Sequence, residues 1–316
     1  MARKGKAVNR HKPSGGGRRP LLALALVVVL IALAFFLLER TRRTVPPPPV
    51  VTGEIPAPHL KLPARPAPQQ QKISSVSLPA AKPQAPVHPR AAGPGSLAII
   101  IDDMGASMQE LQALLSIKLP LTFSVIPSLA RAKGVAGAAH AAGAEVMVHL
   151  PMEPQGYPKQ PMEKIGLLLS MDDDEIEKRV SGYFGFVPYA VGANNHMGSR
   201  FTESAEKMEV VLRVLKGKGI FFVDSRTSPA SVGYRTAREL GLRCGTRQVF
   251  LDNVQDEAAI GKQLLQAAAI ARKSGSAIAI CHPHPATIRA LKAMMPQLAQ
   301  QGITFVHASK IVNGER

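Results

Sequence analysis

The chain has 316 residues, 46% of them hydrophobic, which allows one large domain or two small ones and excludes a small disulfide-stapled protein. Its formal net charge of +17 raises the question of nucleic-acid binding, but 15 of the 39 lysines and arginines lie in residues 1–96, where Glu39 and Glu54 are the only acids. The remainder is only slightly basic, and aromatic residues make up 4% with no Trp, so we expect no nucleic-acid partner.

Residues 21–38 form an unbroken apolar run of eighteen residues, with seven basic residues before it and three, Arg40, Arg42 and Arg43, after it. This length spans a bilayer, and the charge difference places residues 1–20 as a basic tail in the cytoplasm. A cleaved signal peptide is the alternative, but its apolar region is usually about 7 to 15 residues long and ends at a small-x-small site. The nearest such triplet, Ala32-Leu33-Ala34, lies inside the run. We therefore expect a retained single-pass anchor in the inner membrane, with the C-terminal domain in the periplasm.

Residues 39–95 are rich in Pro, Ala, Gln and Lys and contain four consecutive prolines at 46–49. Such a segment cannot build a packed core, and its prolines favour an extended backbone. We interpret it as a semi-rigid spacer that reaches on the order of 100 Å from the bilayer. The folded domain is expected at residues 96–316.

Beyond residue 96, short apolar runs alternate with helical patterns, which indicates βαβ units and a mostly parallel sheet. Strands are predicted at 97–101, 121–126, 145–149, 190–192, 220–223, 247–251, 277–280 and 304–307. Helices are predicted at 107–117, 132–142, 172–186, 203–216, 256–273 and 286–300. This order predicts an α/β fold of the (β/α)-barrel type with seven or eight strands, and a distorted barrel if the short fourth strand, which contains Gly192, is irregular.

Polar and metal-binding residue types follow the predicted strands, at the end where barrels of this type carry their active sites. In chain order they are Asp102 and Asp103, His149, Asn194-Asn195-His196, Asp224 and Ser225, Asp252 and Asn253, His282 and His284, and His307. Any one of them has an ordinary explanation, because Asp and Asn often cap helices and a lone His is more often structural. Their convergence on one rim predicts an active site.

The chemistry of these residue types points to a divalent metal of the zinc class, which takes two imidazoles and a carboxylate and keeps a position open for water. A neighbouring carboxylate can accept a proton from that water, and a separate imidazolium can protonate the leaving group. The tandem pair Asp102-Asp103 can supply both a ligand and a base.

Five ordered stretches carry these residues: AIIIDDMG (98–105), VHLPMEP (148–154), NNHMGSRFT (194–202), FFVDSRTS (221–228) and AICHPHPAT (279–287). Together they resemble the divergent branch of the polysaccharide deacetylases, whose relatives include the NodB-type deacetylases of chitooligosaccharides and peptidoglycan. The resemblance covers residues 96–312 and implies a NodB-like barrel. It implies that Asp102 is the catalytic base, Asp103 a metal ligand and His282 the catalytic acid.

The sequence departs from the wider family in two places. The usual second motif is H-x-x-x-H, whereas His149 is followed four residues later by Glu153, and the family's Arg-x-Pro motif has no counterpart. We expect His149 and His196 to be the imidazole ligands, with Glu153 as the alternative ligand or an outer partner of the site. The expected substrate-binding or supporting residues are Glu153, Asn195, Asp224, Ser225 and His284.

The predicted function is that of a metal-dependent hydrolase, with Zn as the expected metal, that uses activated water to remove N-acetyl groups from a cell-envelope polysaccharide of the N-acetylglucosamine type. One alternative is an envelope factor with weak or no catalysis that binds glycan or a cell-wall or division protein. Another is a metal hydrolase of a different ester or phosphate bond, which would use the same residues.

The two cysteines, Cys244 and Cys281, belong to no zinc-ligand spacing. They could form a disulfide if their Cα atoms lay within about 7 Å of each other. We expect instead two small buried hydrophobic residues.

Overall fold

The structure is a computed structural model that describes residues 94–312. The basic tail, the anchor at 21–38 and nearly all of the spacer expected from the sequence lie outside these residues. Between residues 94 and 312, no helix is both long enough and apolar enough to cross a bilayer.

The described chain alternates strands with helices, as the sequence predicts. The strands are β1 (Ser96–Met104), β2 (Thr122–Val125), β3 (Glu145–Met152), β4 (Ala190–Met197), β5 (Phe221–Asp224), β6 (Cys244–Thr246), β7 (Val249–Phe250), β8 (Ser276–Cys281) and β9 (Thr304–Phe305). The helices are α2 (Met108–Leu115), α3 (Ala132–Ala141), α4 (Asp173–Phe186), α5 (Ala205–Gly217), α6 (Gly233–Glu239), α7 (Glu257–Ser274) and α8 (Pro285–Gln300), with 3-10 turns η1 (Phe201–Glu203) and η2 (Ala308–Lys310). Only the short helix α6 has no counterpart among the predicted helices.

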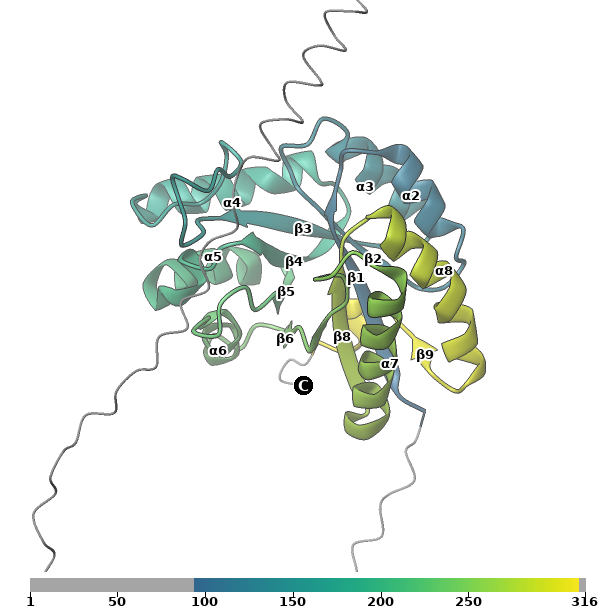
Figure 1. Cartoon of the computed structure of the whole chain (residues 1–316). Coiled ribbons are helices and arrows are strands. Elements are labelled where there is room, and N and C mark those ends of the chain that lie inside the picture. The colour runs from purple at the N-terminus through teal and green to yellow at the C-terminus, as the bar shows by residue number, and fades with distance from the viewer. Residues whose placement is uncertain (1–93, 313–316) are drawn as a thin grey trace, which may run out of the picture. The chain divides into compact units, whose positions relative to one another are not determined.

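The strands form one parallel sheet in the order β6-β5-β4-β3-β2-β1-β8-β7, with β9 paired to the start of β1. The sheet curls, and helices flank it on the outside: α4, α5 and α6 along one half, α2, α3, α7 and α8 along the other (Figure 1). This arrangement confirms an α/β fold with a curled parallel sheet of the NodB-like type.

The sheet is an open barrel, because its edge strands β6 and β7 do not pair with each other. Two residues cross the gap between these strands. The backbone N–H of Arg247 donates to the carbonyl of Asp224 on β5, and that of Gln248 donates to Ile278 on β8. The strand predicted at 247–251 is present only as the two-residue β7, and the prediction misses β6, which precedes it at the opposite edge of the sheet. The barrel is not fully closed, because the chain passes from one edge to the other at this seam.

Strand β4 is longer than the three residues predicted at 190–192. It runs on to Met197, so Asn194, Asn195 and His196 lie within the strand rather than after it. Asn194 and Asn195 are buried and hydrogen-bonded to other side chains. The second half of β4 was missed because its residues are polar, whereas strands were predicted from runs of apolar residues.

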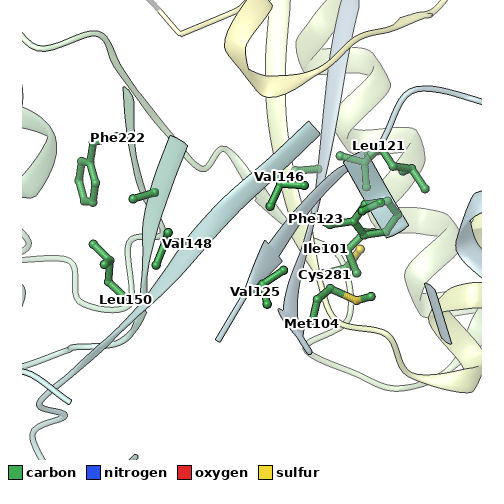
Figure 2. Close-up of a cluster of buried hydrophobic side chains, with 14 of the residues drawn as sticks. Ile101, Met104, Leu121, Phe123, Val125, Val146, Val148, Leu150, Phe222 and Cys281 are labelled. Carbon is green, nitrogen blue, oxygen red and sulfur yellow. The ribbon is translucent and has the colours of Figure 1, made fainter. Parts of the chain in front are cut away.

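Strand residues alternate between two hydrophobic cores, because successive side chains of a strand point to opposite faces. The larger core packs the sheet against the helices and includes Leu97 and Ile99 of β1. Ile101 of the same strand belongs to it and is labelled in Figure 2. The smaller one fills the barrel interior and includes Ala98 and Ile100 of the same strand. This parity determines which residues at the strand ends can reach the interior.

The last strand, β9, does not extend the barrel. It pairs with the first residues of β1, in the register Ser96 with Thr304 and Leu97 with Phe305. His307 consequently lies at the opposite end of the barrel. It borders two hollows there, one lined by Glu145 at the beginning of β3 and one lined by Leu121 directly before β2. The prediction that His307 belongs to the active-site rim is wrong, because β9 is shifted toward the amino end of β1.

Candidate metal centre

The carboxyl ends of the strands surround a cavity of about 720 Å³, a size typical of ligand pockets. Asp102 from β1, His149 from β3, His196 from β4 and His282 after β8 line it. The structure thus gathers four of the five residues predicted for metal binding and catalysis at one cavity. The fifth, Asp103, contacts three of these side chains.

Asp103, His149 and His196 form a group that could hold a metal ion. Oδ1 of Asp103 lies 2.9 Å from Nδ1 of His196 and 3.3 Å from Nε2 of His149, and the ligand atoms of the three residues all lie within 4.8 Å of one another. This oxygen is buried, yet it forms no hydrogen bond of good geometry within residues 94–312. Two ring nitrogens and a carboxylate oxygen that converge in this way fit a cation of the zinc class with an open position.

A backbone irregularity brings both carboxylates of the tandem pair to the site. In a regular strand, Asp102 and Asp103 would point to opposite faces, and Asp102 shares the interior parity of Ile100. Asp103 has a φ of 57°, and the register between β1 and β2 shifts between Ile101 and Met104. A non-glycine residue in this left-handed conformation costs about 1 to 3 kcal/mol, which the surrounding structure must offset. The irregularity turns the Asp103 carboxylate toward the two histidines.

Asn194 fixes the ring orientation of His149. The Nδ2 group of Asn194 donates a 2.8 Å hydrogen bond to a carboxylate oxygen of Asp102, so the Oδ1 atom of Asn194 faces His149. Nδ1 of His149 must then carry the proton in the 2.8 Å hydrogen bond to that oxygen. This leaves Nε2 free as the ligand atom, at 3.5 Å from Asp102 and 3.3 Å from Asp103. No role for Asn194 was predicted from the sequence, although it lies in the polar run at 194–196.

His196 faces Asp103 with Nδ1, whereas His149 does so with Nε2. Nε2 of His196 lies 3.6 Å from Oε1 of Glu163. The strand ends at Met197, directly after His196, and the chain turns there: Met197 has a φ of 50° and Gly198 a φ of 81°. A side chain at Gly198 would lie 2.8 Å from Cβ of Met152, so the turn requires glycine there. No sequence pattern points to Glu163, which lies in an irregular loop.

The two adjacent carboxylates differ in their electrostatics. Asp102 is 3% exposed, and burial raises its pKa despite the opposing effect of His149 and His282. Burial also disfavours the charged form of Asp103, but close contacts with His149 and His196 outweigh it and hold the pKa well below its usual range. In the metal-free protein these carboxylates in turn overcome burial and raise the pKa of His149 to about 9. Asp103 is therefore suited to be an ionised ligand, and Asp102 to accept a proton.

His282 is held by Asp252. The backbone N–H of His282 donates 2.7 Å to Oδ2 of Asp252, its Nδ1 lies 3.1 Å from Oδ1, and the Thr287 hydroxyl also donates to Oδ2. Burial disfavours the charged form of His282, but the hydrogen bond to Asp252 together with the negative charges of Asp102, Asp103 and Asp252 outweighs this and raises the pKa of His282. A cationic imidazole in the cavity can donate a proton to a leaving group. Asp252 was identifiable only as an acid following a strand, and the sequence alone assigns it no role.

Glu153, the alternative ligand, lies apart from the metal group. Its Oε1 accepts a 2.7 Å hydrogen bond from Nη1 of Arg200, and its Oε2 accepts a 2.8 Å bond from the backbone N–H of Leu169. With both oxygens engaged and only 5% of the residue exposed, Glu153 holds two loops together.

Asp224 does not face the cavity. It has the parity of Phe222, which packs on the helix side of β5. Its carboxylate accepts hydrogen bonds from the backbone of Arg226 and Tyr234 and from the Ser231 hydroxyl. Asp224 therefore shapes the loop that follows β5.

Asn195 and Ser225 line the cavity and are joined by a 2.9 Å hydrogen bond from the Ser225 N–H to Oδ1 of Asn195. His284 caps the start of α8, and its Nε2 lies 3.0 Å from the side-chain nitrogen of Gln255. Together with Asp252 and His282 it forms a second group whose ligand atoms lie within 4.8 Å. The buried cysteines Cys244 and Cys281 are free thiols, as expected.

Comparison with known proteins identifies relatives of this chain. Residues 99–312 match the model of a family described as divergent polysaccharide deacetylase. The uncharacterized protein YibQ of Escherichia coli K12 is 42% identical over 219 residues, which cover 69% of this chain and 68% of YibQ. An uncharacterized protein of Haemophilus influenzae is 37% identical over 204 residues, which cover 65% of this chain and 72% of the relative.

The fold also resembles a solved structure, that of the uncharacterized protein ATU2773 from Agrobacterium tumefaciens C58. The two share a TM-score of 0.65 at 24% sequence identity, and the match covers 73% of this chain and 92% of the other. At this identity the likeness concerns the fold.

Proposed function

Because the chain belongs to the family of divergent polysaccharide deacetylases, we propose that it is a metal-dependent hydrolase that removes N-acetyl groups from a cell-envelope polysaccharide. The observation that carries the proposal is the convergence of Asp103, His149 and His196 at the cavity that also holds Asp102 and His282. This arrangement supplies a ligand set, a proton acceptor and a proton donor, which hydrolysis of an amide requires.

Asp103, His149 and His196 would hold the cation, for which we propose Zn. When bound, such a cation supplies Lewis-acid chemistry, because it acidifies water and polarises an amide carbonyl. Asp102 accepts a proton from the attacking water. His282 donates a proton to the leaving nitrogen as the C–N bond breaks, so that acetate and a free amine are the products.

We also propose that residues 21–38 anchor the chain in the inner membrane, with residues 1–20 in the cytoplasm and the barrel in the periplasm. The length of the apolar run and the basic residues before it support this orientation. Alkaline phosphatase fused to the C-terminus should be active in cells and inactive when residues 21–38 are deleted. Activity of the fusion without the apolar run would contradict the proposal.

The catalytic proposal is tested with the full-length chain purified in detergent, as wild type and as the variants His149→Ala and His196→Ala. Metal content is measured by elemental analysis, and acetate release is measured on N-acetylglucosamine polymer and on peptidoglycan. We expect near-stoichiometric metal in the wild type, its loss in both variants, and acetate only from the wild type. His140→Ala is the matched control, because His140 stacks on Tyr189 near the amino ends of the strands.

The possible outcomes separate the functions considered. Metal without acetate from either substrate would favour a glycan- or protein-binding role or hydrolysis of another bond. A wild-type protein that binds no metal would overturn the catalytic proposal.

A further inference from the structure

Two arginines, Arg226 and Arg247, line the cavity that holds the metal group. Arg226 follows β5, and Arg247 lies between β6 and β7 at the open seam of the barrel. Asp102 is the only acid among the residues that line this cavity, and it is hydrogen-bonded to Asn194 beside the metal group. The wall near the seam therefore carries two positive charges without an acidic residue of its own.

Arg247 is fixed in place by three contacts. Its Nε donates to the carbonyl of Ser225 at 2.6 Å, and its Nη2 donates to the carbonyl of Arg226 at 2.9 Å. Its guanidinium carbon lies 5.2 Å from the centre of the Phe250 ring. Nη1 makes no hydrogen bond to any residue between 94 and 312, so one edge of the guanidinium is available to a ligand.

Arg226 is held by its backbone while its side chain is left without a partner. Arg226 has a φ of 53°, and its backbone N–H donates a 2.8 Å hydrogen bond to Oδ1 of Asp224. Within the described part of the chain, its guanidinium forms neither a hydrogen bond nor an ion pair. Burial lowers the pKa of Arg247, and the positive charge of Arg226 lowers it slightly further. The negative charges of Asp102 and Asp224 act in the opposite direction and raise it. The two cations thus lie near enough to repel each other, which a bound anion would relieve.

We propose that Arg226 and Arg247 form a subsite for an anionic group, a carboxylate or a phosphate, carried by the glycan next to its acetylated sugar. This inference rests on the proposed deacetylase function of the same cavity. Guanidinium groups match the planar geometry of both anions through paired hydrogen bonds. The amides of Asn253, Gln263 and Gln266, which line the same cavity, are suited to sugar hydroxyls. A neutral polymer would leave the Arg226 guanidinium and Nη1 of Arg247 without an anionic partner.

The test measures glycan binding calorimetrically, with metal-loaded full-length chain that carries Asp102→Asn so that the ligand is not consumed. The probes are N-acetylglucosamine oligomers without charge, the same oligomers bearing a 6-phosphate, peptide-free peptidoglycan strands with free carboxylates, and those strands after amidation. We expect one anionic probe to bind at least about 10-fold more tightly than its neutral counterpart, the factor expected of a charge-assisted hydrogen bond. The probe that shows this preference identifies the carboxylate or the phosphate.

Adding Arg226→Gln should strongly reduce the preference, because only Nη1 of Arg247 then remains for the anion, and should affect the neutral probe much less than the anionic one. Arg226→Lys should retain part of the preference. Arg213→Gln is the control, because Arg213 is exposed on α5 and paired with Glu209. Equal affinity for charged and neutral probes, or an equal loss for both in Arg226→Gln, would overturn the subsite. Acetate release is measured separately with Asp102 intact. If no glycan released acetate, the proposed deacetylase function would be wrong, whereas the preference for the anionic probe could still be measured.

Discussion

The side-chain amide of Asn194 on β4 joins Asp102 on β1 to His149 on β3. It donates a 2.8 Å hydrogen bond to the Asp102 carboxylate and accepts a 2.8 Å hydrogen bond from the His149 ring. The hydroxyls of Ser124 and Ser225 complete its hydrogen bonds. One fully buried residue thus orients both the proposed base and a proposed metal ligand.

Replacing Asn194 by Ala should affect stability and turnover together. The change leaves buried partners without hydrogen bonds, and we expect the free energy of unfolding to fall by about 2 to 3 kcal/mol. Acetate release should fall about 10- to 100-fold, as is typical when an outer partner of a ligand is removed. Urea unfolding and acetate release measure the two effects. Ser124→Ala, which removes one hydrogen bond of the amide without touching Asp102, should have a clearly smaller effect on turnover, and equal losses in both variants would contradict this role of Asn194.

The two adjacent carboxylates should respond differently to amide substitution. Asp103→Asn removes a charged ligand. Loss of an outer partner of a ligand lowers metal affinity by up to about 100-fold, and loss of a direct ligand should cost at least as much, so we expect the affinity for zinc to fall by at least about 100-fold. Asp102→Asn should keep the metal and lose acetate release, because only the proton acceptor is removed. Zinc titration against a chelator and acetate release distinguish the two. Retention of the metal in Asp103→Asn would show that the ligand set is wrong.

Glu153 should prove to be structural. Glu153→Ala removes the ion pair with Arg200 and the acceptor for Leu169, and Arg200 is half-exposed, so we expect a loss of about 1 to 2 kcal/mol in the free energy of unfolding. The metal content should stay at the wild-type level. Loss of metal from a folded Glu153→Ala protein, checked by circular dichroism, would instead make Glu153 a ligand.

The two thiols should be unreactive in the folded protein. Burial raises the pKa of Cys244 to about 11 and raises that of Cys281 well above its ordinary value. Because the thiolate is the reactive form, labelling by a maleimide at pH 7.5 should be slow and should speed up as the pH rises toward 11. Urea should expose both thiols and allow complete labelling at pH 7.5. Rapid labelling before unfolding, followed by mass spectrometry, would show that the barrel opens around β6 or β8.

Local sequence patterns were sufficient to predict the alternation of strands and helices, the parallel sheet and the membership of the family. They also placed Asp102, His149 and His282 toward the carboxyl ends of their strands, although β1 and β3 run on past Asp102 and His149, because apolar runs and the polar residues that follow them are features of neighbouring positions. Parity along β5 could not show that Asp224 faces away from the cavity, since Phe221, Phe222 and Val223 are all apolar and both faces of the strand are buried.

Only the tertiary structure decided how the site is completed, because its contacts join residues far apart in the chain. Asn194 and Asp102 are separated by 92 positions, and no local pattern records which buried amide meets which carboxylate. The left-handed backbone at Asp103 depends on the register shift against β2, and the shifted pairing of β9 carries His307 to the other end of the barrel. The sequence by itself determined which residue types stand at the ends of the strands; backbone geometry and buried hydrogen bonds determined which of them meet.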